Sequence, residues 1–488
     1  MDGVGTMACT AKMRRGLAVA VSLMAVSACA TPNVDIAQPE VVVPGEWQIA
    51  DPAPVSTDLT QYWTMLGDPL LSEFVEQAIV ENRDLAQSTA RLEQARASLV
   101  QARAGYLPSL SASGGVNRDV GDFARDGVQF NLGADASWEM DLFGQISGNV
   151  AAAEGDLAAQ GYALADLQRL IVGQVAIATI NARSLAEQLA IARSTLAYQD
   201  DNLQIARWRN QAGLVSSLDV EQARTQRAQT AATIPLLESS LTATANSIST
   251  LIGEAPGRVL DEITADAPVA VPAPPLLAGF EAPAEVLRRR PDVRAAEASL
   301  VSSTARIGVA RAQLLPLVRL SGSIGTGPVT AGSLFDVITG GLFAGVSQLI
   351  FDGGRTAAQV DSAEAGAQAS LAAWEQSILG ALEDVETAAV DQRTAGERVA
   401  ITEEALDAAN NSALLARSQY QAGLTDFRTL LTAENQLLSA RNQLVSAQAD
   451  RATAFVRLTQ ALGGGWSISD YDLPPVAAAA ADSDRTAR

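Results

Sequence analysis

The chain has 488 residues, with 34 basic side chains, 55 acidic ones and no histidine, so its formal net charge is −21. Such an acidic chain is a poor candidate for binding nucleic acid, which requires Lys and Arg to neutralise phosphates. Without histidine, the commonest general base and metal ligand are missing, and we expect neither an enzyme nor a metal site.

An export signal opens the chain. Arg14 and Arg15 precede a short apolar run over 16–26, and the small residues Ser27 and Ala28 follow it. This order is typical of a secretory signal, and the run is too short to span a membrane as a helix. We expect residues 1–28 to be removed.

Cys29 follows the signal directly and is the predicted lipid anchor. Residues 26–29 read VSAC and resemble a bacterial lipobox, whose cysteine becomes the lipidated first residue of the mature chain. Several acyl chains anchor far better than one, because each buried CH₂ contributes about 0.8 kcal/mol. Besides this covalent lipid we expect no cofactor. We also expect no disulfide, because the only other cysteine, Cys9, is lost with the signal.

Most of the remaining chain is two copies of one unit. The stretch at 81–114 resembles the stretch at 289–322, with an offset of 208 residues. SWEMDLFGQ at 137–145 resembles SQLIFDGGR at 347–355, with an offset of 210 residues. Landmarks that keep the same register to within two residues indicate a tandem duplication.

The first unit, over 70–253, begins with helical apolar spacing at 70–105. Apolar and polar residues then alternate over 109–118 and 128–140, which predicts two strands. A proline-free stretch over 145–211 follows, with leucines three, four and seven residues apart, as in a coiled-coil seam. A helix of 67 residues would be roughly 100 Å long at 1.5 Å per residue.

The second unit, over 285–463, repeats this order after a proline-rich linker at 254–284. Its predicted elements are a helix, strands over 316–326 and 341–351, a long helix over 355–421 and a return helix. Segment 29–69 is proline-rich and predicted to be extended, and the alanine-rich tail of the C-terminal segment, 464–488, is predicted to be disordered.

The motif Gln-Ala-Gly-Leu ends both long helices, at 211–214 and 421–424. Glycine after a helix is the usual stop, because it adopts a left-handed conformation without strain. We therefore expect helix–turn–helix tips over 212–218 and 422–427, at the end of the molecule opposite the strands. An ordinary surface turn has the same geometry, and a docked partner would distinguish the two.

The four alternating runs are close to the roughly 9–11 residues with which a tilted strand crosses a bilayer. A spanning sheet must close, because unpaired peptide groups are not tolerated in hydrocarbon. Four strands are too few, since a barrel of about eight strands leaves room only for its own side chains. If these strands span, several chains share one barrel, and three chains would supply twelve strands. A soluble four-stranded sheet is the alternative.

Six stretches together resemble the TolC-type outer-membrane efflux proteins, in particular the lipoprotein branch that serves resistance–nodulation–division pumps. They are YWTMLGDPLLSEFVEQAIVENRDLAQSTARLEQARA, SWEMDLFGQ, QAGLVSSLDVEQAR, LRRRPDVRAAEASL, QAGLTDFRTLLTAENQL and QALGGGW. The resemblance implies an α+β membrane protein that forms a homotrimer. Its parts would be one twelve-stranded β-barrel, a long α-helical coiled-coil barrel in the periplasm, and a mixed equatorial collar built from 29–69, 254–284 and 464–488.

The resemblance also implies a function and partners. The protein would be the exit duct of a tripartite efflux pump in the outer membrane of a Gram-negative bacterium, extending into the periplasm. It would passively conduct drugs and other toxic small molecules. Its partners would be outer-membrane lipid, a periplasmic membrane-fusion adaptor protein and an inner-membrane resistance–nodulation–division transporter.

In the family, the helical tips dock the adaptor. The matching positions here are Gly213, Leu214 and Val215 on the first tip, and Gly423 and Leu424 on the second.

The same tips form the closed gate of the family. Asp219 and Tyr420 match two residues that hydrogen-bond in relatives and tie a helix pair shut. The aspartates that often constrict the gate are replaced here by Thr429 and Thr432, and Arg428 stands where a leucine is common. Our hypothesis is a gate closed by Arg428 and Thr432, with Arg428 on a solvated outer face as the alternative.

Two other functions fit parts of the sequence. A structural lipoprotein that tethers the envelope layers would use Cys29 and the long helices, but not the four alternating runs. A periplasmic enzyme is the weakest reading, because the glycine-rich stretches DGGR and GGGW lack the lysine and the strand–loop–helix context of a phosphate-binding loop.

Overall fold

The computed structural model describes residues 41–48, 58–118, 120, 122, 127–265, 270–275, 281–326, 332 and 335–467. The predicted signal peptide, the predicted lipid anchor Cys29 and the tail after residue 467 lie outside the described residues.

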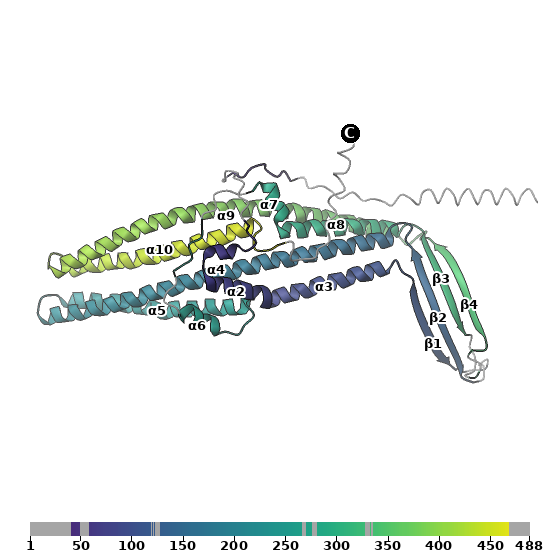
Figure 1. The fold of residues 1–488 in the computed structure, drawn as a ribbon, viewed down its shortest axis with the longest axis horizontal. Helices are drawn as coiled ribbons and strands as arrows, with labels where there is room; N and C mark the ends of the chain where they lie inside the picture. The colour runs from purple at the N-terminus through teal and green to yellow at the C-terminus, as the bar shows by residue number, and fades with distance from the viewer. Residues whose placement is uncertain are drawn as a thin grey trace, which may run out of the picture.

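The chain is elongated, with helices along its long axis and a four-stranded sheet at one end (Figure 1). The first repeat contains α2 (Pro69–Glu81), α3 (Arg83–Ala104), β1 (Ser109–Asn117), β2 (Gln129–Met140), α4 (Gln145–Gln211) and α5 (Ser217–Leu251). The second contains α8 (Pro291–Ala312), β3 (Leu317–Thr326), β4 (Ile338–Ser347), α9 (Arg355–Gln421) and α10 (Phe427–Ala461). Near the middle lie η1 (Tyr62–Leu66), α6 (Arg258–Ala265) and α7 (Pro283–Arg289).

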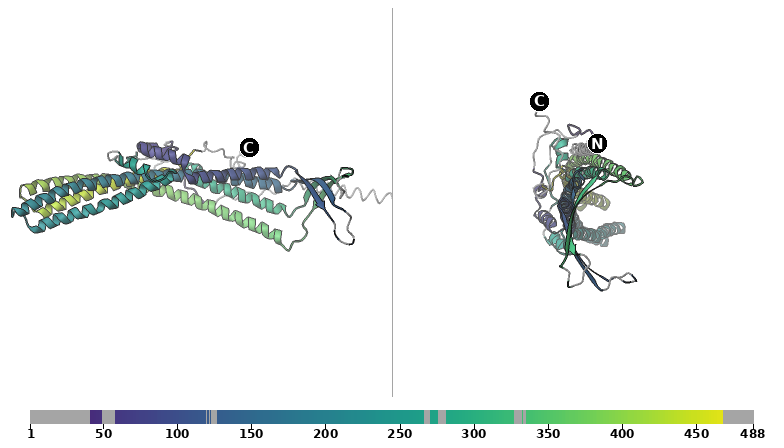
Figure 2. Two further views of the ribbon diagram at one scale, coloured as in Figure 1. Left: turned by 90° about the horizontal axis from the view of Figure 1, so that it is seen from below. Right: turned by 90° about the vertical axis from the view of Figure 1, so that its right-hand side faces the viewer.

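Two helical hairpins form the end opposite the sheet. The long helices α4 and α9 coincide with the predicted ranges and have 67 residues each. α5 returns along α4, and α10 returns along α9 (Figures 1 and 2). α4 also packs against α8 and α10, so it connects the two repeats along its whole length.

Several predicted boundaries were wrong, each for a local reason. The helix expected over 70–105 is two helices, because Asn82 is extended (ψ 130°) and its side chain caps α3 through the Asp84 and Leu85 amides. Pro235 lies inside α5, which continues past it. The linker at 254–284 is not irregular throughout, since it contains α6 and the start of α7.

The turns at the tips are shorter than predicted. α5 begins at Ser217 and α10 at Phe427, so the turns cover 212–216 and 422–426 rather than 212–218 and 422–427. β1, β2 and β3 each lack one terminal residue of the predicted ranges 109–118, 128–140 and 316–326.

The four strands form one antiparallel sheet in the order β1-β2-β3-β4. The β1–β2 hairpin pairs Ser109 with Ser137, and the β3–β4 hairpin pairs Leu317 with Ser347. The two hairpins therefore have the same register, because these residues correspond at the repeat offsets of 208 and 210. Within the described chain, β1 and β4 each have a strand on one side only.

The position of β4 corrects the predicted strand at 341–351. β4 spans 338–347 and ends where its partner begins, at the pair Leu317–Ser347. Residues 348–351 have no strand to pair with in the described chain, so they are not part of the sheet. Ile350 is 95% exposed there.

The sheet has two different faces. Even-numbered positions on all four strands share one face, because every register pairs even residues with even ones. That face carries only apolar residues and glycine, apart from Thr326. The opposite face carries mostly serine, glycine and amides, together with the charged residues Asp135, Glu139 and Arg319.

The largest hydrophobic core lies midway along the molecule, where η1 and α2 pack against α4 and α10. Tyr62, Phe74 and Phe455 are completely buried there, and the Tyr62 ring meets Phe455 edge-on with centroids 6.4 Å apart. Burial raises the pKa of Tyr62. Among the described helices, α4 alone includes a stretch apolar enough to cross a membrane, but more than half of that stretch is buried in the chain, as expected of a core helix.

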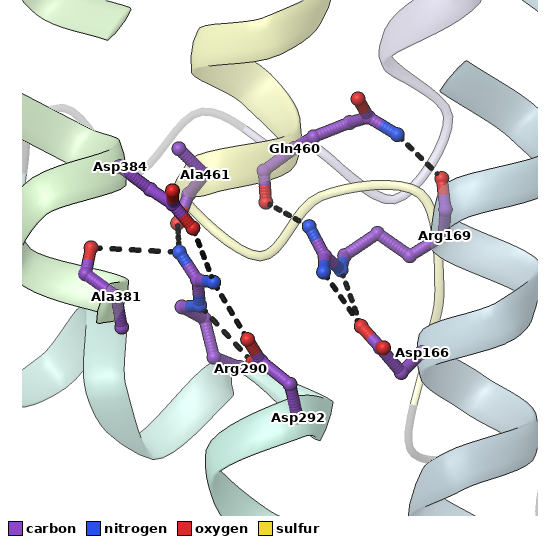
Figure 3. A network of polar contacts seen from close by, with 8 residues as sticks. All are labelled: Asp166, Arg169, Arg290, Asp292, Ala381, Asp384, Gln460 and Ala461. Carbon is purple, nitrogen blue, oxygen red and sulfur yellow. Dashed lines mark hydrogen bonds and ion pairs between the residues drawn. The ribbon is translucent and has the colours of Figure 1, made fainter. Parts of the chain in front are cut away.

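Two buried arginines, one from each repeat, bind the C-terminal carbonyls of α10 (Figure 3). Arg290 donates to the Ala461 and Ala381 carbonyls and to the carboxylates of Asp292 and Asp384. Burial favours the neutral form of Asp292, but the hydrogen bonds and charge of Arg290 hold its pKa below the usual value. Cations at a helix C-terminus stabilise it, so these arginines fix the end of α10 in the middle of the molecule.

Arg169 of α4 completes this arrangement. It donates to the Gln460 carbonyl at 3.1 Å and to Asp166, and the Gln460 side chain donates back to the Arg169 carbonyl at 2.7 Å. Directly after α10, the GGGW segment turns sharply, with Gly463 and Gly465 at positive φ. The Gly465 amide donates to the Leu59 carbonyl at 2.9 Å, so this glycine-rich stretch is joined to the N-terminal segment.

A buried ion pair joins α2 to α4. The Asp68 carboxylate accepts two hydrogen bonds from Arg183, at 3.0 and 3.2 Å, and also caps α2 through the Leu70 and Leu71 amides. The two charged side chains are only 2% and 4% exposed. Removing one charge from such a pair is costly, because the other remains buried without compensation.

We predict that Arg183→Met destabilises the protein by about 3–5 kcal/mol, because Asp68 then remains charged and buried. The double variant Asp68→Asn/Arg183→Met should recover much of this loss, since asparagine still caps α2 and no charge is stranded. Denaturant unfolding followed by circular dichroism measures both effects. A double variant no more stable than Arg183→Met would contradict the account.

Candidate functional site

The two helical tips have the same backbone geometry. Gly213 and Gly423 have φ of 69° and 72°, the left-handed conformation that glycine adopts without strain. The next residue closes each helix, with the Leu214 amide donating to the Arg209 carbonyl and the Leu424 amide to the Gln419 carbonyl, both at 2.8 Å. These are Schellman stops, so the repeated motif encodes a repeated turn.

The tips present apolar side chains to solvent. Leu214 is 73% exposed and Leu424 is 78% exposed. Val215 is half-buried, and its carbonyl accepts a hydrogen bond from the Asn210 side chain at 2.9 Å, which holds the turn. Each of the two tips therefore presents one exposed leucine at the end of the molecule opposite the sheet.

The return helices start with the same kind of cap but with the residue types exchanged. In α5, Ser216 caps the Asp219 amide and the Asp219 carboxylate accepts from the Ser216 amide at 3.0 Å. In α10, Asp426 caps the Thr429 amide at 2.8 Å and also accepts from the Thr429 hydroxyl. These hydrogen bonds hold the pKa of Asp426 below its usual value.

Asp219 and Tyr420 are not hydrogen-bonded to each other in this chain. The Asp219 carboxylate belongs to the α5 cap. Tyr420 is buried, with its ring 5.5 Å from Phe427 and 4.6 Å from the Arg209 guanidinium. Among the described residues, none is a hydrogen-bond partner for the Tyr420 hydroxyl.

Arg428 and Thr432 lie one turn apart on α10, and both are exposed. The Thr432 hydroxyl donates to the Arg428 carbonyl at 2.9 Å. The side chains of the two residues are therefore on the same face of the helix, next to the second tip.

A polar seam between the two hairpins was not predicted. Glu434 of α10 accepts from Asn202 of α4 at 2.9 Å and from Arg417 of α9 at 3.4 Å. Asn435 donates to Gln226 of α5 at 3.0 Å. An apolar cluster near the tips, which includes Tyr420, Phe427 and Leu430, packs beside this seam.

The residues of this seam differ between the two copies of the repeat, and that difference could have indicated it from the sequence. The counterparts of Glu434 and Asn202, at an offset of 210, are Arg224 and Ser412. The duplication thus keeps the tip turns but not the residues that join one hairpin to the other. Within the described part of the chain, no cluster of three acidic or metal-binding side chains is arranged to hold a metal ion.

Comparisons with known proteins agree with the duplicated fold. The family described as Outer membrane efflux protein matches this sequence twice, at residues 74–254 and 282–464. The two starts are 208 residues apart and the two ends 210, which are the offsets of the internal repeat.

Relatives and a solved structure resemble nearly the whole chain. Nodulation protein T of Rhizobium leguminosarum bv. trifolii is 31% identical over 83% of this chain and 88% of its own length. Pyoverdine export outer membrane protein OpmQ of Pseudomonas putida is 31% identical over 92% of this chain and 97% of its own length. The outer-membrane channel OprN superposes with a TM-score of 0.77 and 31% identity, over 90% of this chain and 98% of that one. The chain therefore belongs to the outer membrane efflux protein family and acts in efflux at the outer membrane.

Proposed function

We propose that three copies of the chain form one duct, with a twelve-stranded β-barrel in the outer membrane and an α-helical tunnel below it. The two-faced sheet is the observation that carries this proposal. Its apolar face is suited to lipid and its serine- and glycine-rich face to a water-filled lumen. A structural tether between the envelope layers would leave this apolar face without a role.

The free edges of the sheet support assembly. β1 and β4 have unpaired backbone groups along one side in the described chain, and a membrane-spanning sheet cannot leave them unpaired. The number of copies rests on the resemblance to TolC-type trimers, because four strands from each of three chains give twelve.

The packing of the helices supports the same assembly. Inside the chain, α4 of the first repeat packs against α8 and α10 of the second. By the repeat, the equivalent partners of α9 are α3 and α5 of a neighbouring copy. A closed ring of copies satisfies both sets of contacts, because heterologous contacts that close form rings.

Cargo passes through this duct without chemistry. We assign it small molecules such as drugs, delivered by a periplasmic adaptor and an inner-membrane resistance–nodulation–division transporter. The OpmQ relative is named for pyoverdine export, which supports a small-molecule cargo. Docking of the adaptor would use Leu214 and Leu424, since both are exposed on rigid turns.

The gate would lie at the tips. Arg428 and Thr432 are exposed on one face of α10, as a constriction requires. Asp219 and Tyr420 would tie the helix pair shut when the gate is closed, which fits a Tyr420 hydroxyl that lacks a partner in the described chain.

We predict that wild-type protein inserts into planar bilayers as a channel of low conductance, and that Arg428→Ala raises its conductance about threefold or more. Three arginines around a constriction repel cations, so the variant should also become more cation-selective. Arg83→Ala, at an exposed position of α3 away from the tips, is the control and should behave like wild type. Equal conductance and ion preference in Arg428→Ala would remove Arg428 from the gate, and a monomeric, silent wild type would overturn the duct itself.

We predict that Leu214→Asp/Leu424→Asp abolishes efflux while leaving the channel intact. A charge on each tip removes the apolar surface offered to the adaptor, at a cost of about 3–6 kcal/mol for two leucines that docking buries. Drug sensitivity of cells and co-purification of the adaptor measure the loss. The control Leu214→Met/Leu424→Met keeps an apolar surface and should retain both, and normal efflux by the aspartate variant would contradict tip docking.

A lipid on Cys29 would anchor the duct beside its barrel. Val41, the first described residue, packs near Ile378 of α9. Ile378 lies 23 residues from Arg355, where α9 leaves the sheet, or about 35 Å along the helix. The 12 residues from Cys29 to Val41 can span at most about 40 Å. The chain is thus just long enough to bring Cys29 to the membrane.

We predict that cells fed labelled palmitate incorporate it into the wild-type protein but not into Cys29→Ala. Cys9→Ala is the matched control and should be labelled like wild type, since Cys9 precedes the cleavage site. Label retained by Cys29→Ala would show that the anchor is elsewhere or absent.

A further inference from the structure

We infer that β4 of one copy pairs with β1 of the next in one definite register, in which Ser347 lies opposite Ser113 of the neighbour. The inference rests on the proposed assembly and goes beyond it by naming the residues that meet. Its template is the β2–β3 pair inside the chain, which already joins a strand of the first repeat to a strand of the second.

The register follows from the repeat, because the β2–β3 pairs can be transferred to β4 and β1 by the two repeat offsets. Each β2 residue has its counterpart 210 positions later, in or just after β4, and each β3 residue has its counterpart 208 positions earlier, in or just after β1. The two hairpins obey these offsets along their whole paired length, as the pairs Asn117–Gln129 and Gly325–Thr339 show at their far ends.

The template pairs run from Met140–Val318 to Gly133–Gly325. Applying the two offsets turns them into Ile350–Leu110 and Phe343–Asn117, with the second residue of each pair in the next copy. The β4 edge of one copy therefore meets the β1 edge of its neighbour over residues 343–350 and 110–117.

This register explains why β4 ends at Ser347 within one chain. Residues 348–350 correspond to 138–140, which in β2 pair with β3 and not with β1. Within one chain, residues 348–350 have no strand beside them, because β3 begins at Leu317, the partner of Ser347. In the assembly, β1 of the neighbour reaches them, and β4 extends to Ile350 as the alternation in the sequence indicates.

The side chains agree with the register. Even residues pair with even ones, so the apolar face stays continuous across the junction. Ile350 and Leu110, which are 95% and 80% exposed in one chain, become a cross-strand aliphatic pair like Met140–Val318. On the other face, Ser347 and Ser113 are small and fit opposite each other.

Four double cysteine variants of the full chain test the register. Ser113→Cys/Ser347→Cys and Ser111→Cys/Leu349→Cys are in register, whereas Ser111→Cys/Ser347→Cys and Ser113→Cys/Leu349→Cys are displaced by two residues. Directly opposite residues lie within disulfide reach, but diagonal neighbours are about 7–8 Å apart. Each substitution occurs in one pair of each kind, so a folding defect cannot imitate the expected pattern.

After mild oxidation of outer membranes, we expect the two in-register variants to run as covalent trimers on denaturing gels without reductant, at least about tenfold more than the displaced variants. Reductant should return all of them to monomers, and single-cysteine variants should not be linked. Linking of the displaced pairs instead would overturn the register. If no pair links, native mass spectrometry in detergent separates the failures: trimers would overturn the register alone, and monomers would overturn the proposed duct as well.

Discussion

Every peptide N–H and C=O within a hydrocarbon layer needs a hydrogen-bond partner, and this chain cannot meet that requirement alone. Its sheet has an apolar face for lipid, but β1 and β4 each lack a neighbour on one side within the described chain. The requirement for partners at these edges connects the rest of the architecture, because a ring of chains that closes the sheet also places the helices beneath it in a ring. The hydrogen bonds that Arg290 and Arg169 donate to the last carbonyls of α10 hold the end of that helix in the middle of the molecule.

In the helical part, the requirement is that a long helix reverses direction while the backbone groups at its end keep hydrogen-bond partners. Both long helices end in a Schellman turn at glycine, and both return helices start with a carboxylate–hydroxyl cap. Backbone groups at the turn are therefore satisfied locally, and the exposed leucines there need no other support. A rigid turn with exposed apolar residues can bind a partner with little loss of conformational entropy.

Much of this fold could be predicted from the sequence, because its strongest signals are periodic. The long helices coincide with the predicted ranges, since coiled-coil spacing and the absence of proline persist for many turns. The breaks were harder to predict: Asn82 divides a helix by capping its second half, while Pro235 does not interrupt α5. The end of β4 was misplaced because alternation shows where a strand can lie but not whether its partner is in the same chain.

The candidate site likewise has features that could be predicted from the sequence and features that could not. The tip turns follow from glycine in the motif, which is a local property. The bond expected between Asp219 and Tyr420 is not formed within the chain, and the Asp219 carboxylate instead accepts from the nearby Ser216 amide. The contact between Glu434 and Asn202 could not be predicted from local sequence patterns, because the two residues are more than 200 positions apart.

That seam makes the two repeats unequal at the tip end of the molecule. Two hairpins in each of three copies give six junctions around the axis, of which three lie within chains and three between them. The junctions within chains have the carboxylate of Glu434 beside Asn202, while the corresponding positions between chains are Arg224 and Ser412. In the proposed assembly the tip end would have true threefold symmetry, with two chemically distinct kinds of contact in alternation. A substitution at Glu434 changes only every second contact around the ring, so selection can adjust one set while the other stays as it is.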